Sequence, residues 1–158
     1  MRVLVTGATG CIGRRLVPFL RGRGHEVVRG VRRPTEVGDR RLDLDEPATL
    51  APAVAGVEAA FYLVHGLARG PAYAAWEADV AARFARACRD AGVARIVYLG
   101  GVMPAAGAST HLAARAATGA ALRSAGVAVV ELRAGMIVAS DSASFVLARD
   151  IATTEAAG

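Results

Sequence analysis

The spacing of three glycines directly after the first apolar run limits the possible folds of this chain more than any other feature. The run Val3-Leu4-Val5 leads into Thr6, and Gly7, Gly10 and Gly13 follow at equal intervals. The first glycine lets the chain leave a strand sharply, the second leaves room for a phosphate, and the third lets a helix pack closely. The pattern predicts a strand–turn–helix unit whose helix N-terminus binds a pyrophosphate. A glycine-rich turn that holds no ligand is the alternative.

Short β-branched runs alternate with helical stretches rich in Ala, Leu and Arg along the rest of the chain. The stretch from Glu58 to Val64 is apolar almost throughout, as in a parallel strand buried on both faces. Right-handed crossovers would place helices on both faces of the sheet. We therefore expect a doubly wound α/β Rossmann fold with a mostly parallel sheet of about six strands, in the order 3-2-1-4-5-6. The expected strands are 3–6, 26–31, 40–42, 58–64, 95–99 and 127–132, and the expected helices are 12–21, 47–54, 74–91, 111–124 and 145–152.

Length and composition suit one folded domain. The chain has 158 residues, of which 54% are hydrophobic, and this is enough for one sizeable core. Its apolar runs are too short to span a bilayer and its N-terminus lacks a signal-peptide pattern, so we expect a cytoplasmic protein without a membrane span. The net charge of +5 comes from arginines scattered along helices, which argues against nucleic acid as a partner.

The cysteines and histidines show no metal-ligand spacing. Cys11 lies in the glycine turn and Cys88 in an expected helix, so both are expected to be reduced thiols. His25, His65 and His111 are far apart in the sequence. We expect no metal ion.

Two arginines at the end of the second expected strand bear on the choice of dinucleotide. In dinucleotide-binding folds an acidic residue here binds the ribose 2′-hydroxyl, whereas an arginine accommodates a 2′-phosphate. Arg32 and Arg33 stand at this position, and the first acid is Glu36. We therefore expect NADP to be preferred over NAD, although charged residues after a strand also serve simply as a solvated loop. Asp43 and Leu44, after the third expected strand, would lie at the adenine amino group and the adenine ring.

These residues and two further runs carry a resemblance to a known superfamily. The glycine turn, Asp43-Leu44, the run from Tyr62 to His65 and the run from Arg95 to Gly101 resemble the atypical or extended short-chain dehydrogenases/reductases. The most similar branch is that of bacterial NAD(P)H-binding proteins related to NmrA-like regulators and to accessory subunits of complex I. The resemblance extends to about residue 145, and it is specific for the superfamily rather than for one reaction.

The resemblance implies a set of residues around a nicotinamide dinucleotide. It places the loop 63–66 beside the adenine-side ribose, residues 99–101 at the nicotinamide and the turn 133–135 at the nicotinamide amide. With the residues named above, the expected binding set is Gly7, Thr9, Gly10, Cys11, Ile12, Gly13, Arg32, Arg33, Asp43, Leu44, Leu63, Val64, His65, Leu99, Gly100, Gly101, Ala134 and Gly135.

The chain departs from the superfamily at the residues that transfer protons. Active members usually place a Ser after the fifth strand, and a Tyr and a Lys four residues apart on the next helix. Gly100 and Gly101 stand at the serine position, and the chain contains no lysine. His111 and Arg115 lie one helical turn apart in place of the Tyr and Lys, so we expect them to be the catalytic pair. The alternative is that His111 is only an exposed residue at a helix start capped by Ser109.

A second departure is the short segment after the last expected strand. Extended members continue into a small substrate-binding lobe, of which residues 139–158 would be a remnant, and we expect a single domain over 1–158. A partner subunit would then supply the lid, or the chain is a truncated relative. Superfamily members commonly pair through helices equivalent to 74–91 and 111–124, which would give a homodimer. Asp141 and the serines around it would be substrate ligands at the cleft mouth or part of a surface loop.

Three functions are compatible with these residues. The first is an NADP-dependent oxidoreductase or epimerase-like enzyme acting on a small molecule, with His111 or water transferring the proton. The second is a dinucleotide-binding redox sensor or regulatory protein without turnover. The third is a structural subunit that its bound dinucleotide stabilises. The fold alone does not choose between them.

Overall fold

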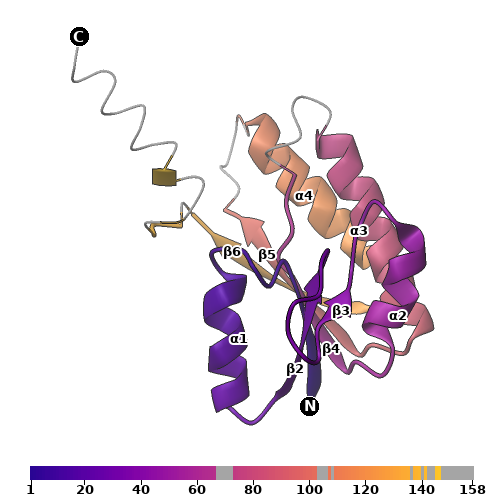
Figure 1. Cartoon of the computed structure of the whole chain (residues 1–158). Helices are drawn as coiled ribbons and strands as arrows, with labels where there is room; N and C mark the ends of the chain where they lie inside the picture. Colours follow the sequence, from indigo (N-terminus) through magenta and orange to yellow (C-terminus); the bar gives the residue numbers. More distant parts are fainter. Residues whose placement is uncertain are drawn as a thin grey trace.

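A six-stranded parallel sheet forms the centre of the computed structural model (Figure 1). The structure describes residues 1–66, 73–102, 107, 109–135, 137–139, 141 and 145–146. The strand order is β3-β2-β1-β4-β5-β6, which confirms the expected doubly wound topology. The elements are β1 (Arg2–Thr6), α1 (Gly13–Gly22), β2 (Glu26–Val31), β3 (Arg40–Arg41), a 3-10 turn (Pro47–Thr49), α2 (Leu50–Val54), β4 (Ala59–Tyr62), α3 (Tyr73–Asp90), β5 (Arg95–Gly101), α4 (Thr110–Arg123) and β6 (Ala128–Ala134).

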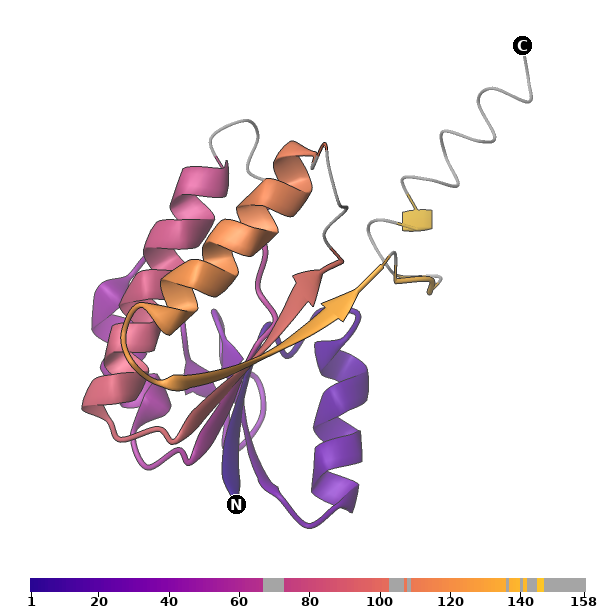
Figure 2. The ribbon, with the colours of Figure 1, turned by 180° about the vertical axis from the view of Figure 1, so that it is seen from behind.

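Helices lie on both faces of the sheet. Successive side chains of a strand point to opposite faces, so an apolar strand needs cover on both of them. Val3 and Val5 of β1 pack on the side of α1, whereas Leu4 joins the larger core under α2, α3 and α4. Figure 2 shows α1 on the opposite side of the sheet from α3 and α4. On the α1 side the cover is uneven, since Val130 and Leu132 of β6 remain 42% and 53% exposed.

The element boundaries differ from the expected ones where tertiary hydrogen bonds compete with the strand ladder. β4 ends at Tyr62 instead of Val64, because the Leu63 N–H donates to the Thr6 hydroxyl at 3.1 Å. β5 and β6 run further than expected because they pair with each other as far as Gly101 and Ala134. Ala134 therefore belongs to the strand and not to the turn that the sequence placed at 133–135. The helix expected at 145–152 lies outside the described residues, except for its first two.

The carboxyl ends of the strands meet along one edge of the sheet, and this positions the site. β1 pairs with β2 on one side and with β4 on the other, so the strand order reverses beside β1. In open α/β sheets, ligands bind in the crevice outside the carboxyl ends at this reversal. The glycine turn follows β1 and therefore lies at that crevice.

Candidate functional site

The glycine turn brings α1 into close contact with the end of β1. Gly7 has a φ of +63°, which side chains rarely allow, and the Gly10 N–H donates to the Gly7 carbonyl at 2.9 Å. A Cβ on Gly13 would lie 2.3 Å from the Gly7 oxygen and 2.6 Å from Ala8 Cα. No L side chain fits at such distances, so the packing of α1 requires glycine at this position.

The N-terminus of α1 is open to an anion. Its N-cap residue, Ile12, makes no side-chain capping hydrogen bond, and the first turn contains no acidic residue. A Cβ on Gly10 would have only the Gly7 oxygen within 4 Å, so the surface of the turn faces open space. Uncapped N–H groups at the positive end of a helix suit a phosphate group. The turn therefore fits a pyrophosphate sterically and electrostatically.

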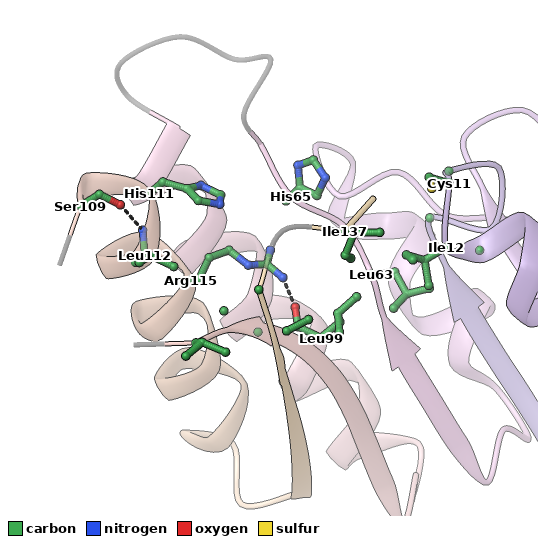
Figure 3. A pocket seen from close by; sticks show the side chains of 18 residues that line it. Cys11, Ile12, Leu63, His65, Leu99, Ser109, His111, Leu112, Arg115 and Ile137 are labelled. Carbon is green, nitrogen blue, oxygen red and sulfur yellow. Dashed lines mark hydrogen bonds between the residues drawn. The ribbon is translucent and has the colours of Figure 1, made fainter. Parts of the chain in front are cut away.

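Two cavities of about 520 Å³ each meet at this turn. We name them after the half of the dinucleotide that the sequence analysis expects in each. The adenosine-side cavity lies over the ends of β1, β2 and β3, and the nicotinamide-side cavity lies between the ends of β5 and β6 and the start of α4 (Figure 3). They share Gly7, Gly10, Leu63 and His65, so they form one continuous cleft. Each volume lies in the usual range of small-molecule sites. Two adjoining cavities of this size suit a ligand with two nucleotide halves.

The cleft collects nearly all of the residues expected to bind the dinucleotide. Besides the four shared residues, the adenosine-side cavity is lined by Thr9, Arg32, Asp43, Leu44 and Val64. The nicotinamide-side cavity is lined by Cys11, Ile12, Gly13, Leu99, Gly100, Gly101, Ala134, Gly135 and the expected catalytic pair, His111 and Arg115. Arg33 lines neither of these two cavities, so of the two arginines only Arg32 faces the cleft.

A network of ion pairs shapes the loop that carries Arg32. Arg29 of β2 pairs with Glu36, and its Nε lies 3.3 Å from Asp39 Oδ1. The other oxygen of Asp39 accepts hydrogen bonds from the N–H groups of Thr35 and Glu36, at 2.9 and 3.0 Å. The acids of this loop are thus engaged by Arg29 and by the backbone. Among the described residues, neither Glu36 nor Asp39 forms an ion pair with Arg32, which lines the adenosine-side cavity together with Asp43 and Asp45.

Trp76 and Asp45 also line the adenosine-side cavity, and the sequence reasoning missed both as site residues. The Trp76 Nε1–H donates to Asp45 Oδ1 at 2.7 Å. Helical spacing placed Trp76 on the buried face of α3 with Val80 and Phe84, which are fully buried. Trp76 stands at the end of that stripe, where the helix reaches the cleft. The ring lies against Gly66, where an added Cβ would be 3.0 Å from it, and helical spacing gives no signal for this contact.

The start of α4 places His111 in the nicotinamide-side cavity. Ser109 is the N-cap of the helix, and its hydroxyl accepts a hydrogen bond from the Leu112 N–H at 3.3 Å, as the capping interpretation expected. His111 is nevertheless half-buried and lines the cavity instead of lying free on the surface. Its Nδ1 is buried without a hydrogen-bond partner among the described residues. Ser109 therefore caps the helix while His111 lines the cavity, so the two interpretations of this helix start are compatible.

Arg115 lies one turn further along α4 and is held firmly. Its Nη2 donates to the Leu99 carbonyl (Figure 3), and its guanidinium lies 4.9 Å from the centroid of the Tyr98 ring. The Tyr98 hydroxyl in turn donates to the Arg115 carbonyl at 2.9 Å. The side chain is 8% exposed, and its Nη1 has no partner in the described part of the chain. This places a fixed positive charge against the cavity.

His65 lies where the two cavities meet, and Figure 3 shows its ring between His111 and Cys11. Desolvation lowers the pKa of His65, the positive charges of Arg115 and His111 lower it further, and Glu77 acts in the opposite direction. The imidazole therefore stays neutral to lower pH than usual. It is then both a hydrogen-bond donor and an acceptor at neutral pH.

We expect this shifted pKa to make the folded state less stable in mild acid. The unfolded chain binds a proton at His65 near pH 6.5, whereas the folded chain binds it only at lower pH. The unfolded state holds more protons in that interval, so the free energy of unfolding falls as the pH drops through it. Urea denaturation at several pH values should show a smaller fall for His65→Gln than for the unmodified protein. Identical slopes would contradict the electrostatic environment described above.

None of the three tyrosines is among the described residues that line the two cavities, so we find no alternative proton donor of this type there. Tyr62 and Tyr98 are almost fully buried in the core on the α3 side and do not line either cavity. Burial raises the pKa of both, that of Tyr98 to about 12. Gly100 and Gly101 lie where the superfamily usually has its serine, and a Cβ on Gly101 would meet Leu112 at 2.7 Å. The serine of the usual proton relay is therefore missing from the sequence, and a serine at position 101 would also collide with the present position of Leu112.

Asp141 lies against the glycine turn. It forms ion pairs with Arg14 and Arg15, the latter at 3.0 Å, and the Cys11 thiol donates to it at 3.5 Å. The hydrogen bond from Arg15 holds the pKa of Asp141 well below its usual range. Desolvation has the largest effect on the Cys11 thiol and raises its pKa, and the hydrogen bond to Asp141 and the charge of this carboxylate raise the pKa further. The thiol is therefore less reactive than usual. Asp141 thus lies near the cleft but is engaged with α1.

The remaining expectations concern metals and membranes. Among the described residues, no group of three or more His, Cys, Asp or Glu side chains is arranged to hold a metal ion. None of the helices in that part of the chain has the length and apolar character needed to cross a bilayer.

Comparison with known proteins agrees with this geometry. A family model described as NAD(P)H-binding matches residues 7–148. A 2-alkyl-3-oxoalkanoate reductase of Stenotrophomonas maltophilia is 34% identical over 110 residues. The crystal structure of Citrobacter sp. triphenylmethane reductase complexed with NADP(H) is 24% identical, with a TM-score of 0.76. A short-chain dehydrogenase/reductase superfamily protein of Agrobacterium tumefaciens with bound NAD is also 24% identical, with a TM-score of 0.70. At this identity the two structures show the shared fold.

The chain is shorter than these proteins. The aligned region covers 62% of this chain and 32% of the Stenotrophomonas reductase. The match to triphenylmethane reductase covers 100% of this chain and 56% of that one, and the Agrobacterium match covers 84% and 48%. The matches therefore span about half the length of the two solved structures and about a third of the Stenotrophomonas reductase.

Proposed function

The chain belongs to the NAD(P)H-binding family, and from this premise we propose that it is an NADP-dependent oxidoreductase that reduces a carbonyl group, with His111 as the proton donor. The observation that carries the proposal is the position of His111 and Arg115 in the same cavity as Leu99, Gly100 and Gly101. When bound, the reduced dinucleotide supplies a hydride for the carbonyl carbon. The relative in Stenotrophomonas is named as a reductase, which supports this direction of the reaction.

His111 has the properties that proton transfer to a carbonyl oxygen requires. An imidazole gives up and takes up protons near neutral pH. The residue lines the cavity, and its Nδ1 is buried without a hydrogen-bond partner among the described residues, so none of these residues fixes the proton on that nitrogen. Arg115 lies on the same face of α4 and provides a fixed cation next to it. A screen of carbonyl compounds for oxidation of NADPH, followed by absorbance, tests the activity directly.

Preference for NADP follows from Arg32, and we expect Arg32→Ala to weaken NADP binding by about 10- to 100-fold. Arg32 lines the adenosine-side cavity, where we expect the 2′-phosphate of NADP, while NAD has only a hydroxyl at that position. NAD affinity should therefore change little. Arg33→Ala is the matched control, because Arg33 does not line the cleft. Equal losses for both dinucleotides, or from both variants, would contradict the assignment of Arg32.

Trp76 provides a direct binding signal, since it is the only tryptophan of the chain. It lines the adenosine-side cavity, so we expect saturable quenching of its fluorescence when NADP is added. Reduced NADP should in addition give energy transfer from the indole to the nicotinamide. Competition by adenosine 2′,5′-bisphosphate should reverse the quenching. Unchanged fluorescence, together with no thermal shift, would reject dinucleotide binding.

A redox sensor without turnover is the second candidate function. It is favoured by the burial of Tyr62 and Tyr98 and by the absence of lysine from the sequence, which remove the usual proton relay. This function predicts that oxidised and reduced NADP bind with clearly different affinities while no carbonyl compound is reduced. The Trp76 titration measures the first property, and the NADPH oxidation screen measures the second.

A further inference from the structure

The nicotinamide-side cavity contains a buried cation, Arg115, that forms no ion pair with a carboxylate among the described residues. Arg115 is more than nine-tenths buried, and its Nη1 has no hydrogen-bond partner in the described part of the chain. Among the described residues that line this cavity there is no Asp or Glu. A buried charge with an unsatisfied donor is costly unless a partner compensates it. The cavity therefore favours an occupant with a negative charge.

Nearby carboxylates are engaged elsewhere. Glu77 is buried behind the cavity, where its oxygens accept from the Gly66 N–H and from the Thr118 hydroxyl. Asp141 pairs with Arg14 and Arg15 at the glycine turn. In the part of the chain that the structure describes, neither forms an ion pair with Arg115.

The guanidinium is also preorganised for recognition. Its Nη2 is bound to the Leu99 carbonyl and its plane lies near the Tyr98 ring, so Nη1 has a defined position. A charge held in this way loses little conformational freedom when it binds an anion. Charge-assisted hydrogen bonds from arginine to carboxylates are among the strongest available to a protein.

Building on the function proposed above, we propose that Arg115 binds the carboxylate of the substrate, and that the substrate is a short oxo acid. His111 and Arg115 are four residues apart on α4, which separates their Cβ atoms by about 6 Å. A carboxylate at Arg115 then leaves a carbonyl one or two bonds away within reach of His111. The cavity walls are apolar at Leu63, Leu112 and Ile137, which suits small alkyl substituents.

Binding of acetoacetate and of its methyl ester tests this assignment. The two probes share the carbonyl and differ in the negative charge. Calorimetry with the free protein and with its NADP⁺ complex, in which no reduction occurs, should show acetoacetate binding at least about tenfold more tightly than the ester. Arg115→Gln should remove this preference and Arg115→Lys should keep part of it. Arg123→Gln is the matched control on the same helix. Arg123 does not line the cavity, and its guanidinium pairs with Glu131 at a distance of 2.9 Å.

The outcomes separate this proposal from the function on which it is built. Equal binding of acid and ester by the unmodified protein would overturn the role of Arg115, even if NADP binds normally. Loss of NADP⁺ affinity in Arg115→Gln with an unchanged preference for the acid would overturn it too, and would assign Arg115 to the dinucleotide ribose. If Trp76 reports no dinucleotide binding, the proposed function fails, and the comparison on the free protein still decides whether Arg115 recognises a carboxylate. Because the unmodified protein gives the primary result, poor folding of a variant does not remove the test.

Discussion

Alanine at Gly13 is expected to abolish dinucleotide binding and to destabilise the fold by on the order of 3 kcal/mol. The added Cβ would lie 2.3 Å from the Gly7 oxygen and 2.6 Å from Ala8 Cα, and both are backbone atoms that cannot rotate away. The N-terminus of α1 would have to move away from β1, and its N–H groups would lose their alignment with a pyrophosphate. Thermal unfolding and Trp76 fluorescence measure the two effects separately.

Gly10→Ala separates binding from folding at the same turn. Its Cβ would meet only the Gly7 oxygen, at 3.3 Å, and otherwise point into open space. We expect the melting temperature to change little, while the affinity for NADP falls at least about 100-fold because the methyl group occupies the place of a phosphate. Gly22→Ala, at the other end of α1 with nothing within 4 Å of its Cβ, is the control for both properties. Normal NADP binding by Gly10→Ala would show that the pyrophosphate does not lie on this turn.

The second large effect is expected at His111. If His111 donates the proton, His111→Ala should lower kcat by about 10²- to 10⁴-fold. Its imidazole lies at the start of α4, and its loss leaves the glycine turn and Arg32 untouched, so the NADP affinity should stay within about twofold. Stopped-flow measurement of NADPH oxidation gives the rate, and the Trp76 titration gives the affinity.

A matched set of histidine variants makes this result specific. His25 follows α1 and does not line the cleft, so His25→Gln should leave kcat unchanged. His111→Gln keeps a polar group of similar reach but cannot transfer a proton, so it should be as slow as His111→Ala. Full activity of His111→Gln would mean that another group, such as His65 or a water molecule, supplies the proton.

The fold could be predicted from local patterns because parallel strands and glycine turns have strong local requirements. The apolar run of β4 is typical of a parallel strand that is buried on both faces, and the positive φ of Gly7 requires a residue without a Cβ. Both signals lie within a few residues of the sequence. The boundaries were less predictable, since the end of β4 depends on a hydrogen bond between Leu63 and Thr6, which are far apart in the sequence.

The site was predictable only in outline. Arg32 and Arg33 are equivalent in the sequence, and only the loop conformation set by Arg29 and Asp39 directs one of them to the cleft. Helical spacing predicted Trp76 to be a core residue. The spacing shows which face of the helix is buried, but it does not show where that face reaches a cavity. Neighbouring residues alone cannot reveal such differences, because they depend on which other elements surround a side chain.

The sequence by itself determined the strand–turn–helix unit at Gly7, Gly10 and Gly13, the order of the sheet and the absence of the usual Tyr and Lys pair. These depend on backbone geometry, periodicity and residue type. Only the tertiary structure decided that Nη1 of Arg115 lies buried beside the cleft without a partner among the described residues. Burial and the lack of a counter-ion are properties of everything packed around a group, and elements distant in the sequence supply that packing.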